Sequence, residues 1–446
     1  MTGYQTHLKL TSSDTMNISN VFSRNTAFLL FILLVAIHAI SVYYVGGTQF
    51  IFAVLWFGVC VTSFYLLFLF FLGDSLAHIF DRLHDKLAVI KRENILTVIE
   101  IIVVVFPAFY FVMVGKIPVI EMLNTKDYIR SSGIRHAFFY DLPTYLRYSG
   151  EYYIRAVVPV WIVYCYVAQR RALLPVIFAG SFFAFAIVTK STLIIALLPL
   201  LIFLVCRGKL LLGVLLIAWM SALIIASVVV QQKSDLLTAP QNTIIGPANK
   251  DVNSPPFGEN SGVDRDHQKR EVSVGEAIIA FIYKPVEAIG IRALTVPGLV
   301  EKQWLETYSE KTMLEGGCGY RWFAPFVPCT FVNLANKVWL KYYPDLAKEG
   351  LDGTVTAADY IQAYANFGLI GVFMSSFLMA VILILLRAIF HDPVLNLAFN
   401  TVPLALSFES VLTTLLNTGG WGLTILMVLI LFDRRRDVTA ATILVD

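Results

Sequence analysis

The chain has 446 residues, of which 57% are hydrophobic and only 15% are charged, against about 25% charged residues in an ordinary soluble domain. This composition excludes a soluble globular protein, and the lack of alternating segments of about ten residues excludes a transmembrane barrel. The formal net charge of +3 is small and says little about partners. For a membrane protein of this kind we expect no nucleic-acid partner.

Apolar segments recur along the chain and are the main signal of its fold. They lie at about 26–46, 49–72, 95–114, 153–169, 173–189, 191–206, 210–230, 366–388, 394–415 and 420–432. Runs of about 18 apolar residues or more are typical of transmembrane helices. We therefore predict an all-α polytopic membrane protein with about ten transmembrane helices. The polar start leads into a full-length span, so no removable signal peptide is expected.

The distribution of lysine and arginine orients the chain in the membrane. With the N-terminus inside, the inside connections carry 14 cations, and the outside connections, apart from one long loop, carry seven. Cytoplasmic loops carry the excess of Lys and Arg, whereas long loops are translocated largely regardless of charge. Both termini of this multi-pass protein are therefore predicted to be cytoplasmic.

The first outer loop, 115–153, and the start of the next span hold most of the outside cations. The four arginines in this stretch, interleaved with tyrosines, are Arg130, Arg135, Arg147 and Arg155. Arginine forms forked hydrogen bonds to phosphate oxygens. We predict that the stretch binds an anionic ligand, such as a diphosphate at the membrane surface. The alternative is an interfacial basic belt that contacts lipid headgroups.

The second outer loop, 231–365, has two parts. Its first part is rich in Pro, Asn, Gly and Asp and is expected to be irregular. The stretch GEAIIAFIYKPVEAIGIRALTVPGLV predicts one or two helices on the membrane surface, broken at Pro285 and Pro297. Cys318 and Cys329 also lie in this loop, so a disulfide is one possibility if the loop is extracytoplasmic.

The stretch LDGTVTAADYIQAYANFGLIGV predicts a helix that enters the eighth span. Asp352 or Thr354 is its candidate N-cap. Gly368 and Gly371 would allow close packing of another backbone. The chain thus divides into an N-terminal membrane bundle, a long outer loop and a C-terminal group of helices, at 1–230, 231–365 and 366–446.

Three further cations are candidates for ligand contact. Lys190 interrupts an apolar run, and a turn there would let Ser191 cap the next helix, so that the helix N–H groups and the ammonium form a phosphate pocket. Simple snorkelling of Lys190 is the alternative. Arg292 and Arg321, with Tyr320, could join the cations of the first loop, or could be solvated loop residues.

A general base for a sugar hydroxyl would come from Asp141, Glu151 or Asp359, although each could instead pair with arginine or cap a helix. Glu100 and Glu409 lie in predicted spans, where carboxylates are functional candidates or structural contacts. The sequence has no P-loop, no GxGxxG, no HExxH and no paired-acid motif for a metal-bound sugar nucleotide. We therefore expect no cofactor and no metal site. A lipid diphosphate substrate needs neither, because its leaving group is already activated.

The order of these features resembles a known family. A basic, Tyr-rich loop ending in EYYIRAVVPVWIVY is followed by VTKSTLIIALLPL, RALTVPGLV and DYIQAYANFGLIGVFMSS. This pattern, over about 95–390, resembles the Wzy-type polymerases of O-antigen and related surface polysaccharides. An Arg-x10-Gly pattern that occurs in some members of that family is missing here.

The resemblance implies a bacterial inner-membrane glycosyltransferase with two large periplasmic loops and a GT-C-like architecture. Such an enzyme transfers a growing glycan from undecaprenyl diphosphate onto an incoming undecaprenyl-diphosphate-linked oligosaccharide and releases undecaprenyl diphosphate. Membrane lipids and a chain-length regulator, a Wzz-type co-polymerase, would be its partners. Two alternatives remain open: an O-antigen ligase-type glycan transferase, and a lipid or sugar flippase or permease.

Overall fold

The computed structural model describes residues 24–87, 93–124, 134, 138, 142–188, 190–238, 295–308, 314–321, 323–348 and 353–432. Within these ranges the regular structure is helical. The helices are α2 (Thr26–Gly46), α3 (Thr48–Leu87), α4 (Glu93–Val114), α5 (Pro118–Asn124), α7 (Thr144–Tyr152), the π-helix η2 (Tyr153–Val157), α8 (Val158–Val167), α9 (Leu173–Ala186), α10 (Lys190–Cys206), α11 (Leu210–Thr238), the 3-10 helix η3 (Ala324–Phe326), α13 (Leu334–Tyr342), α14 (Pro344–Lys348), α15 (Asp359–Phe367), α16 (Leu369–Ile389), α17 (Pro393–Leu406), α18 (Leu412–Leu416) and α19 (Trp421–Leu431). A further helix covers 295–307.

Five helices in the described ranges are long and apolar enough to cross a membrane, namely α2, α3, α4, α11 and α16. Four others, α9, α10, α17 and α19, are apolar but shorter. The one remaining predicted segment, 153–169, is divided between η2 and α8. The described chain is thus a helical bundle of membrane-protein character, and the count of ten spans stays a prediction.

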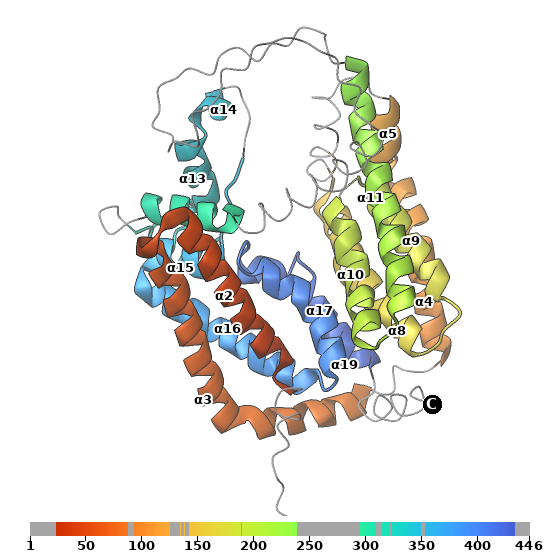
Figure 1. Ribbon diagram of the computed structural model, residues 1–446, viewed down its shortest axis with the longest axis horizontal. Coiled ribbons are helices and arrows are strands. Elements are labelled where there is room, and N and C mark those ends of the chain that lie inside the picture. Colours follow the sequence, from red (N-terminus) through yellow and green to blue (C-terminus); the bar gives the residue numbers. More distant parts are fainter. Residues whose placement is uncertain are drawn as a thin grey trace, which may run out of the picture.

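The helices form two groups joined by the C-terminal part of the chain (Figure 1). One group contains α2, α3, α15 and α16, and the other contains α4, α8, α9, α10 and α11. Helix α17 packs against both α2 and α10, and so bridges the groups. We call the end of the bundle at which α2 begins the lower end, and the opposite end, near 295–307 and α13, the upper end.

Two predicted helix boundaries are wrong. The segment 394–415 is not one span, because α17 ends at Leu406 and a stretch with only the short α18 follows. We call 407–420 the polar segment, because it contains SFES, TT and NTGG, and these side chains favour turns over a helix interior. The predicted continuous helix into the eighth span is broken at Gly368, whose φ of 62° ends α15.

The expected caps and breaks also differ from the structure. Helix α15 has Ala358 at its N-cap, so Thr354 does not cap it, and Asp352 lies outside the described residues. The helix over 295–307 runs through Pro297 instead of breaking there. Close packing at Gly371 is confirmed, since an added Cβ would lie 2.0 Å from the carbonyl oxygen of Ala363. This contact holds α15 against α16.

A disulfide joins Cys318 to Cys329 near the upper end, with their Cα atoms 6.0 Å apart. One of the two possibilities left by the sequence is therefore realised in the structure. The disulfide closes the turn that begins after Leu314. The N–H of Gly319 in this turn donates to the side-chain oxygen of Asn366 at 2.9 Å, and this hydrogen bond holds Tyr320 and Arg321 near α15. The loop is thus fixed on both sides.

Candidate functional site

The polar segment links two groups of residues at the upper end. On one side the N–H of Leu412 donates to Asp359 Oδ1 at 3.3 Å. On the other side the hydroxyl of Tyr152 donates to Asn417 Oδ1. Gly420 approaches η2 so closely that an added Cβ would lie 3.2 Å from the Cβ of Arg155. The polar segment therefore connects α15 to the basic stretch that follows the first outer loop.

Arg155 and Glu151 form an ion pair at this junction. The Nε of Arg155 lies 2.5 Å from Oε2 of Glu151, and the side chains are 31% and 18% exposed. Arg155 lies in η2, and such π-helical turns occur often at functional sites. Tyr153 in the same turn donates to the carbonyl of Val103 at 2.8 Å. Pro107 leaves that carbonyl without its usual donor, so this hydrogen bond fixes η2 against α4.

A small cavity of about 30 Å³ lies beside Arg155. Its walls come from α8, α10, α17 and α19, and most of its lining is apolar, including prolines from α8, α10 and α17. Its polar lining consists of Arg155 and Thr424. A cavity of this size holds roughly one or two water molecules. Arg155 therefore borders an apolar pocket and is itself partly exposed.

Asp359 is buried and holds the polar segment in place. The hydroxyl of Ser375 donates to its Oδ2 at 2.7 Å, and its other oxygen accepts from Leu412. Burial raises the pKa of Asp359 above its ordinary value, although both hydrogen bonds oppose this effect. Burial also raises the pKa of Tyr320, and the charge of Asp359 adds to that rise. Asp359 and Tyr320, both predicted site residues, are thus close enough to affect each other electrostatically.

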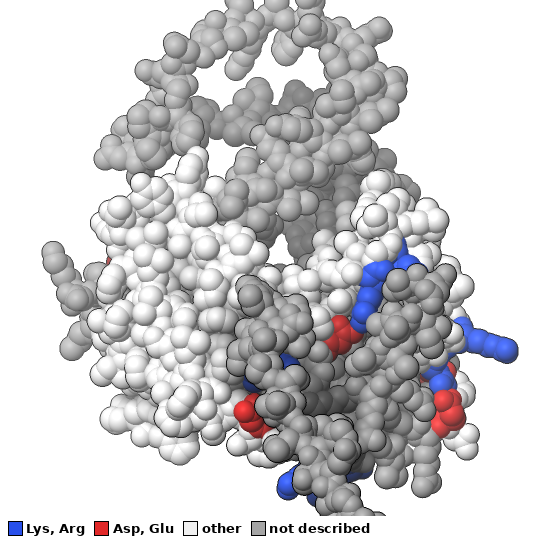
Figure 2. All heavy atoms as spheres, turned by 60° about the horizontal axis from the view of Figure 1, so that its bottom comes forward, with Lys and Arg blue, Asp and Glu red and all other residues white. Residues whose placement is uncertain are grey.

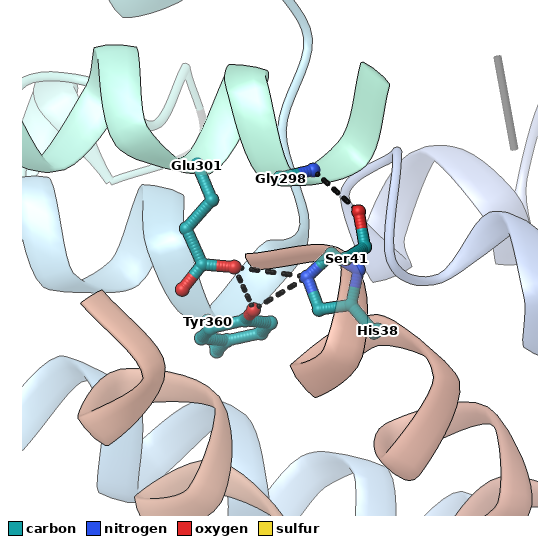
Figure 3. A network of polar contacts seen from close by, with 5 residues as sticks. All are labelled: His38, Ser41, Gly298, Glu301 and Tyr360. Atoms are coloured by element: carbon teal, nitrogen blue, oxygen red, sulfur yellow. Dashed lines mark hydrogen bonds and ion pairs between the residues drawn. The ribbon is translucent and has the colours of Figure 1, made fainter. Parts of the chain in front are cut away.

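Tyr360, the residue after Asp359, is fixed by a buried network (Figure 3). Oε2 of Glu301 is 2.9 Å from His38 Nε2 and accepts the hydroxyl hydrogen of Tyr360 at 2.7 Å. Next to it, the N–H of Gly298 donates to the hydroxyl of Ser41 at 3.0 Å. These contacts clamp the helix over 295–307 onto α2 and α15 (Figure 3).

The other predicted residues take different positions. Arg147 on α7 is half-buried. Arg321 is exposed, with its guanidinium carbon 4.9 Å from the ring centre of Phe331, and Tyr320 stacks on Phe367. Four predicted residues lie outside the described part of the chain, together with the side chain of Lys190: Arg130, Arg135, Asp141 and Arg292.

The turn before Lys190 differs from the prediction. Helix α10 begins at Lys190, so Ser191 lies in its first turn and is not the N-cap. The preceding Val188 is fully buried and has a φ of 55°, a strained value for a β-branched residue. The α9–α10 turn is therefore held by packing, and Lys190 is the first residue of the helix that follows it.

The two carboxylates that were predicted to lie within spans, Glu100 and Glu409, have different environments. Glu100 is buried and pairs with Arg170 at the lower end, and Arg170 also binds Glu93 at 2.6 Å. This arrangement makes Glu100 a structural partner. Glu409 is exposed, because it lies in the polar segment instead of in a span.

Sequence reasoning missed the polar segment and the network around Glu301. A signal for the first was present, since NTGG and SFES are poor transmembrane sequences. Nothing local marked His38 or Glu301 as partners, because they are 263 residues apart. Comparisons with family models, with curated proteins and with solved structures find no match to this chain.

Proposed function

We propose that the protein is a polymerase of lipid-linked oligosaccharides, with its site at the upper end around Arg155 and the polar segment. The observation that carries the proposal is the Arg155–Glu151 ion pair, which lies at the mouth of an apolar pocket and contacts the polar segment. A cation beside an apolar wall suits a diphosphate attached to a polyprenyl chain. The resemblance to Wzy-type polymerases supplies the reaction.

The disulfide supports an extracytoplasmic upper end. Disulfides persist in oxidising compartments and are rare in the cytosol, and Cys318–Cys329 lies at that end. The positive-inside bias favours the same orientation, since it places both termini in the cytoplasm. We therefore propose the bacterial inner membrane, with ten spans, a GT-C-like architecture and the site facing the periplasm.

The proposed reaction is a glycosyl transfer. The acceptor hydroxyl of an incoming lipid-linked repeat unit attacks the anomeric carbon of the growing glycan. The bond from that carbon to the diphosphate oxygen breaks, and undecaprenyl diphosphate leaves with the electron pair. Arg155 stabilises the charge that develops on the leaving group. The acceptor proton passes to a carboxylate.

Glu151 is the proposed acceptor of that proton. Of the predicted acids in the described ranges, Asp359 is buried and occupied by two donors, whereas Glu151 is partly exposed. A diphosphate that binds Arg155 competes with Glu151 for the guanidinium, and so frees the carboxylate for the hydroxyl. Asp359 then positions the polar segment through Leu412. The sugar lies outside the small cavity, where the predicted loop cation Arg147 can contribute.

The test uses the full-length protein in vesicles with a synthetic polyprenyl-diphosphate-linked repeat unit, and follows products by gel and mass spectrometry. Wild-type protein is expected to form a ladder of polymers and to release polyprenyl diphosphate. Arg155→Ala is expected to lower the rate about 100-fold or more, as loss of a charge-stabilising donor does. Arg171→Ala, an exposed cation of the α8–α9 turn, is the matched control and should retain activity.

Several outcomes would overturn the proposal. Transfer of a single intact glycan to another acceptor would indicate a ligase. Movement of the lipid substrate across the vesicle without any bond formation would indicate a flippase. Normal ladders from Arg155→Ala, with the protein folded by size-exclusion chromatography, would remove Arg155 from the site. A Wzz-type regulator is expected to change ladder length and not the ability to polymerise.

A further inference from the structure

Tyr110, near the upper end of α4, has a buried hydroxyl that makes no hydrogen bond. The residue is 1% exposed, and no residue that the structure describes gives the hydroxyl a hydrogen-bond partner. A buried tyrosine hydroxyl usually has a partner, because burying a hydroxyl without a hydrogen bond costs free energy. The hydroxyl of Tyr110 is therefore a candidate for a contact that forms in another state of the protein.

The hydroxyl of Tyr110 lies against α7, next to the proposed proton acceptor. A Cβ added to Gly150 would lie 2.8 Å from the hydroxyl oxygen, so a larger residue there would push the hydroxyl aside. Glu151 is the next residue, and its carboxylate is close enough to act on Tyr110 electrostatically. The tyrosine ring packs edge-on against Phe111 and Phe183, with ring centres 5.5 Å and 5.1 Å away. The ring is thus fixed by aromatic packing, with its polar end toward α7.

The partner of Glu151 in the structure is Arg155. Oε2 of Glu151 and Nε of Arg155 are 2.5 Å apart, but neither atom is aligned for a hydrogen bond with any described residue. Both side chains are partly exposed, so an anionic ligand can reach the guanidinium. The pair rests on charge attraction, and a diphosphate, which binds arginine through two parallel hydrogen bonds, can replace the carboxylate.

Ion pairs at the lower end are held by more than one contact. Figure 2, in which this end is turned forward, shows side chains of both signs beside one another. Arg170 donates to Glu93 at 2.6 Å and to the hydroxyl of Thr97 at 3.3 Å. Asp392, the partner of Arg207, also accepts from a backbone N–H of α17 at 2.8 Å. The side chains of the upper pair have no such additional hydrogen bond within the described ranges, so that pair is the one suited to exchange.

We propose that Tyr110 is a positioning residue for the diphosphate-bound state: when a diphosphate takes the guanidinium of Arg155, the carboxylate of Glu151 turns to accept the hydroxyl hydrogen of Tyr110. This inference rests on the proposed function, because it needs a diphosphate on Arg155. One carboxylate oxygen then accepts from Tyr110, and the other faces the acceptor hydroxyl of the sugar. The new hydrogen bond offsets part of the ion-pair energy that Glu151 loses, so it strengthens diphosphate binding and orients the base.

The experiment is isothermal titration calorimetry of the full-length protein in detergent with undecaprenyl diphosphate, which measures binding without any transfer reaction. Tyr110→Phe removes only the hydroxyl and should weaken binding on the order of tenfold, as loss of a charge-assisted hydrogen bond does. Its unfolding midpoint should stay the same or rise, because the hydroxyl that is removed has no partner in the unbound protein. Tyr308→Phe is the matched control and should bind as the wild type does, because Tyr308 also has a buried hydroxyl without a described partner.

A second variant separates positioning from a structural role. Glu151→Ala should bind the diphosphate at least as tightly as the wild type, because Arg155 no longer has a competing carboxylate. In that background Tyr110→Phe should have no further effect, since no carboxylate remains to accept the hydrogen bond. Equal weakening by Tyr110→Phe in both backgrounds would indicate general damage to the site and would overturn the inference.

The remaining outcomes distinguish this inference from the proposed function. Failure of the wild type to bind undecaprenyl diphosphate would overturn the proposed function, and the inference with it. Binding by the wild type, together with equal affinity in Tyr110→Phe, would overturn the inference alone. A large loss of stability in Tyr110→Phe would also overturn it, because the hydroxyl would then have a partner in the unbound protein.

Discussion

The buried carboxylate of Glu301 offers a direct test of how the long outer loop is held on the bundle. Glu301 is 1% exposed, and its Oε2 contacts His38 at 2.9 Å and Tyr360 at 2.7 Å. Glu301→Ala removes both contacts at once. It leaves two buried polar groups, one on α2 and one on α15, without their shared acceptor.

The expected loss of stability is about 3 kcal/mol. Removing one partner of a buried ion pair costs about 3–5 kcal/mol, because the remaining polar group stays buried without compensation. The lower end of that range applies here, since His38 Nε2 and the Tyr360 hydroxyl remain 3.0 Å apart and keep their own hydrogen bond. Glu301→Gln should lose less, because its side-chain oxygen can still accept from Tyr360.

The assay is denaturant unfolding of the purified protein in detergent. Fluorescence reports on the tryptophans, which include Trp304, 1% exposed on the same helix. Lys302→Ala is the matched control, because the side chain of Lys302 is 37% exposed on that helix and its pair with Glu306 spans 4.0 Å. Its loss should cost no more than about 1 kcal/mol. Equal shifts in Glu301→Ala and Lys302→Ala would refute the view that the buried network clamps the loop.

Three further predictions follow from individual contacts. Burial raises the pKa of Asp359, so the unfolded chain loses its proton first as the pH rises above about 4, and this residue's contribution to stability falls until the folded pKa is passed. The unfolding free energy of Asp359→Asn should lack that decline, and parallel pH curves for variant and wild type would contradict it. Replacing Cys318 and Cys329 together by serine should cost up to about 3 kcal/mol, because the disulfide closes a short loop. Thiol labelling at Cys318 or Cys329 without reductant, distinguished by peptide mapping from labelling of the exposed free Cys206, would show instead that the bond does not form. Arg170→Ala should cost about 3–5 kcal/mol, because it leaves a buried carboxylate of α4 unpaired, whereas the exposed Arg171→Ala should be nearly neutral, and similar unfolding midpoints for the two would refute this.

Hydropathy alone located the elements well, because a membrane helix must satisfy its backbone polar groups within its own segment. Each predicted apolar segment coincides with one or more helices of the structure. Errors arose where a local polar signal competed with an apolar average, as in the polar segment 407–420. The chain there contains enough leucine to look like a span, but its Ser, Thr, Asn and Gly residues favour turns.

The candidate site could be predicted only in part. Arg155 and Glu151 are four residues apart, so their pairing follows from helical geometry and needs no tertiary information. Whether Asp359 is exposed or buried was not readable from its neighbours in sequence. Its burial results from the packing of α15 on α16 and from the return of the polar segment to α15.

The sequence by itself determined that this protein is a bundle of apolar helices with basic and aromatic loops, because those features depend on local composition and periodicity. Tertiary structure decided which polar groups meet. The polar segment lies between Asp359 and Arg155, Glu301 is paired with a histidine on α2, and Glu100 is paired with Arg170. Such pairings depend on how distant helices pack, and the energy of a buried polar contact is set by a partner that no local pattern reveals.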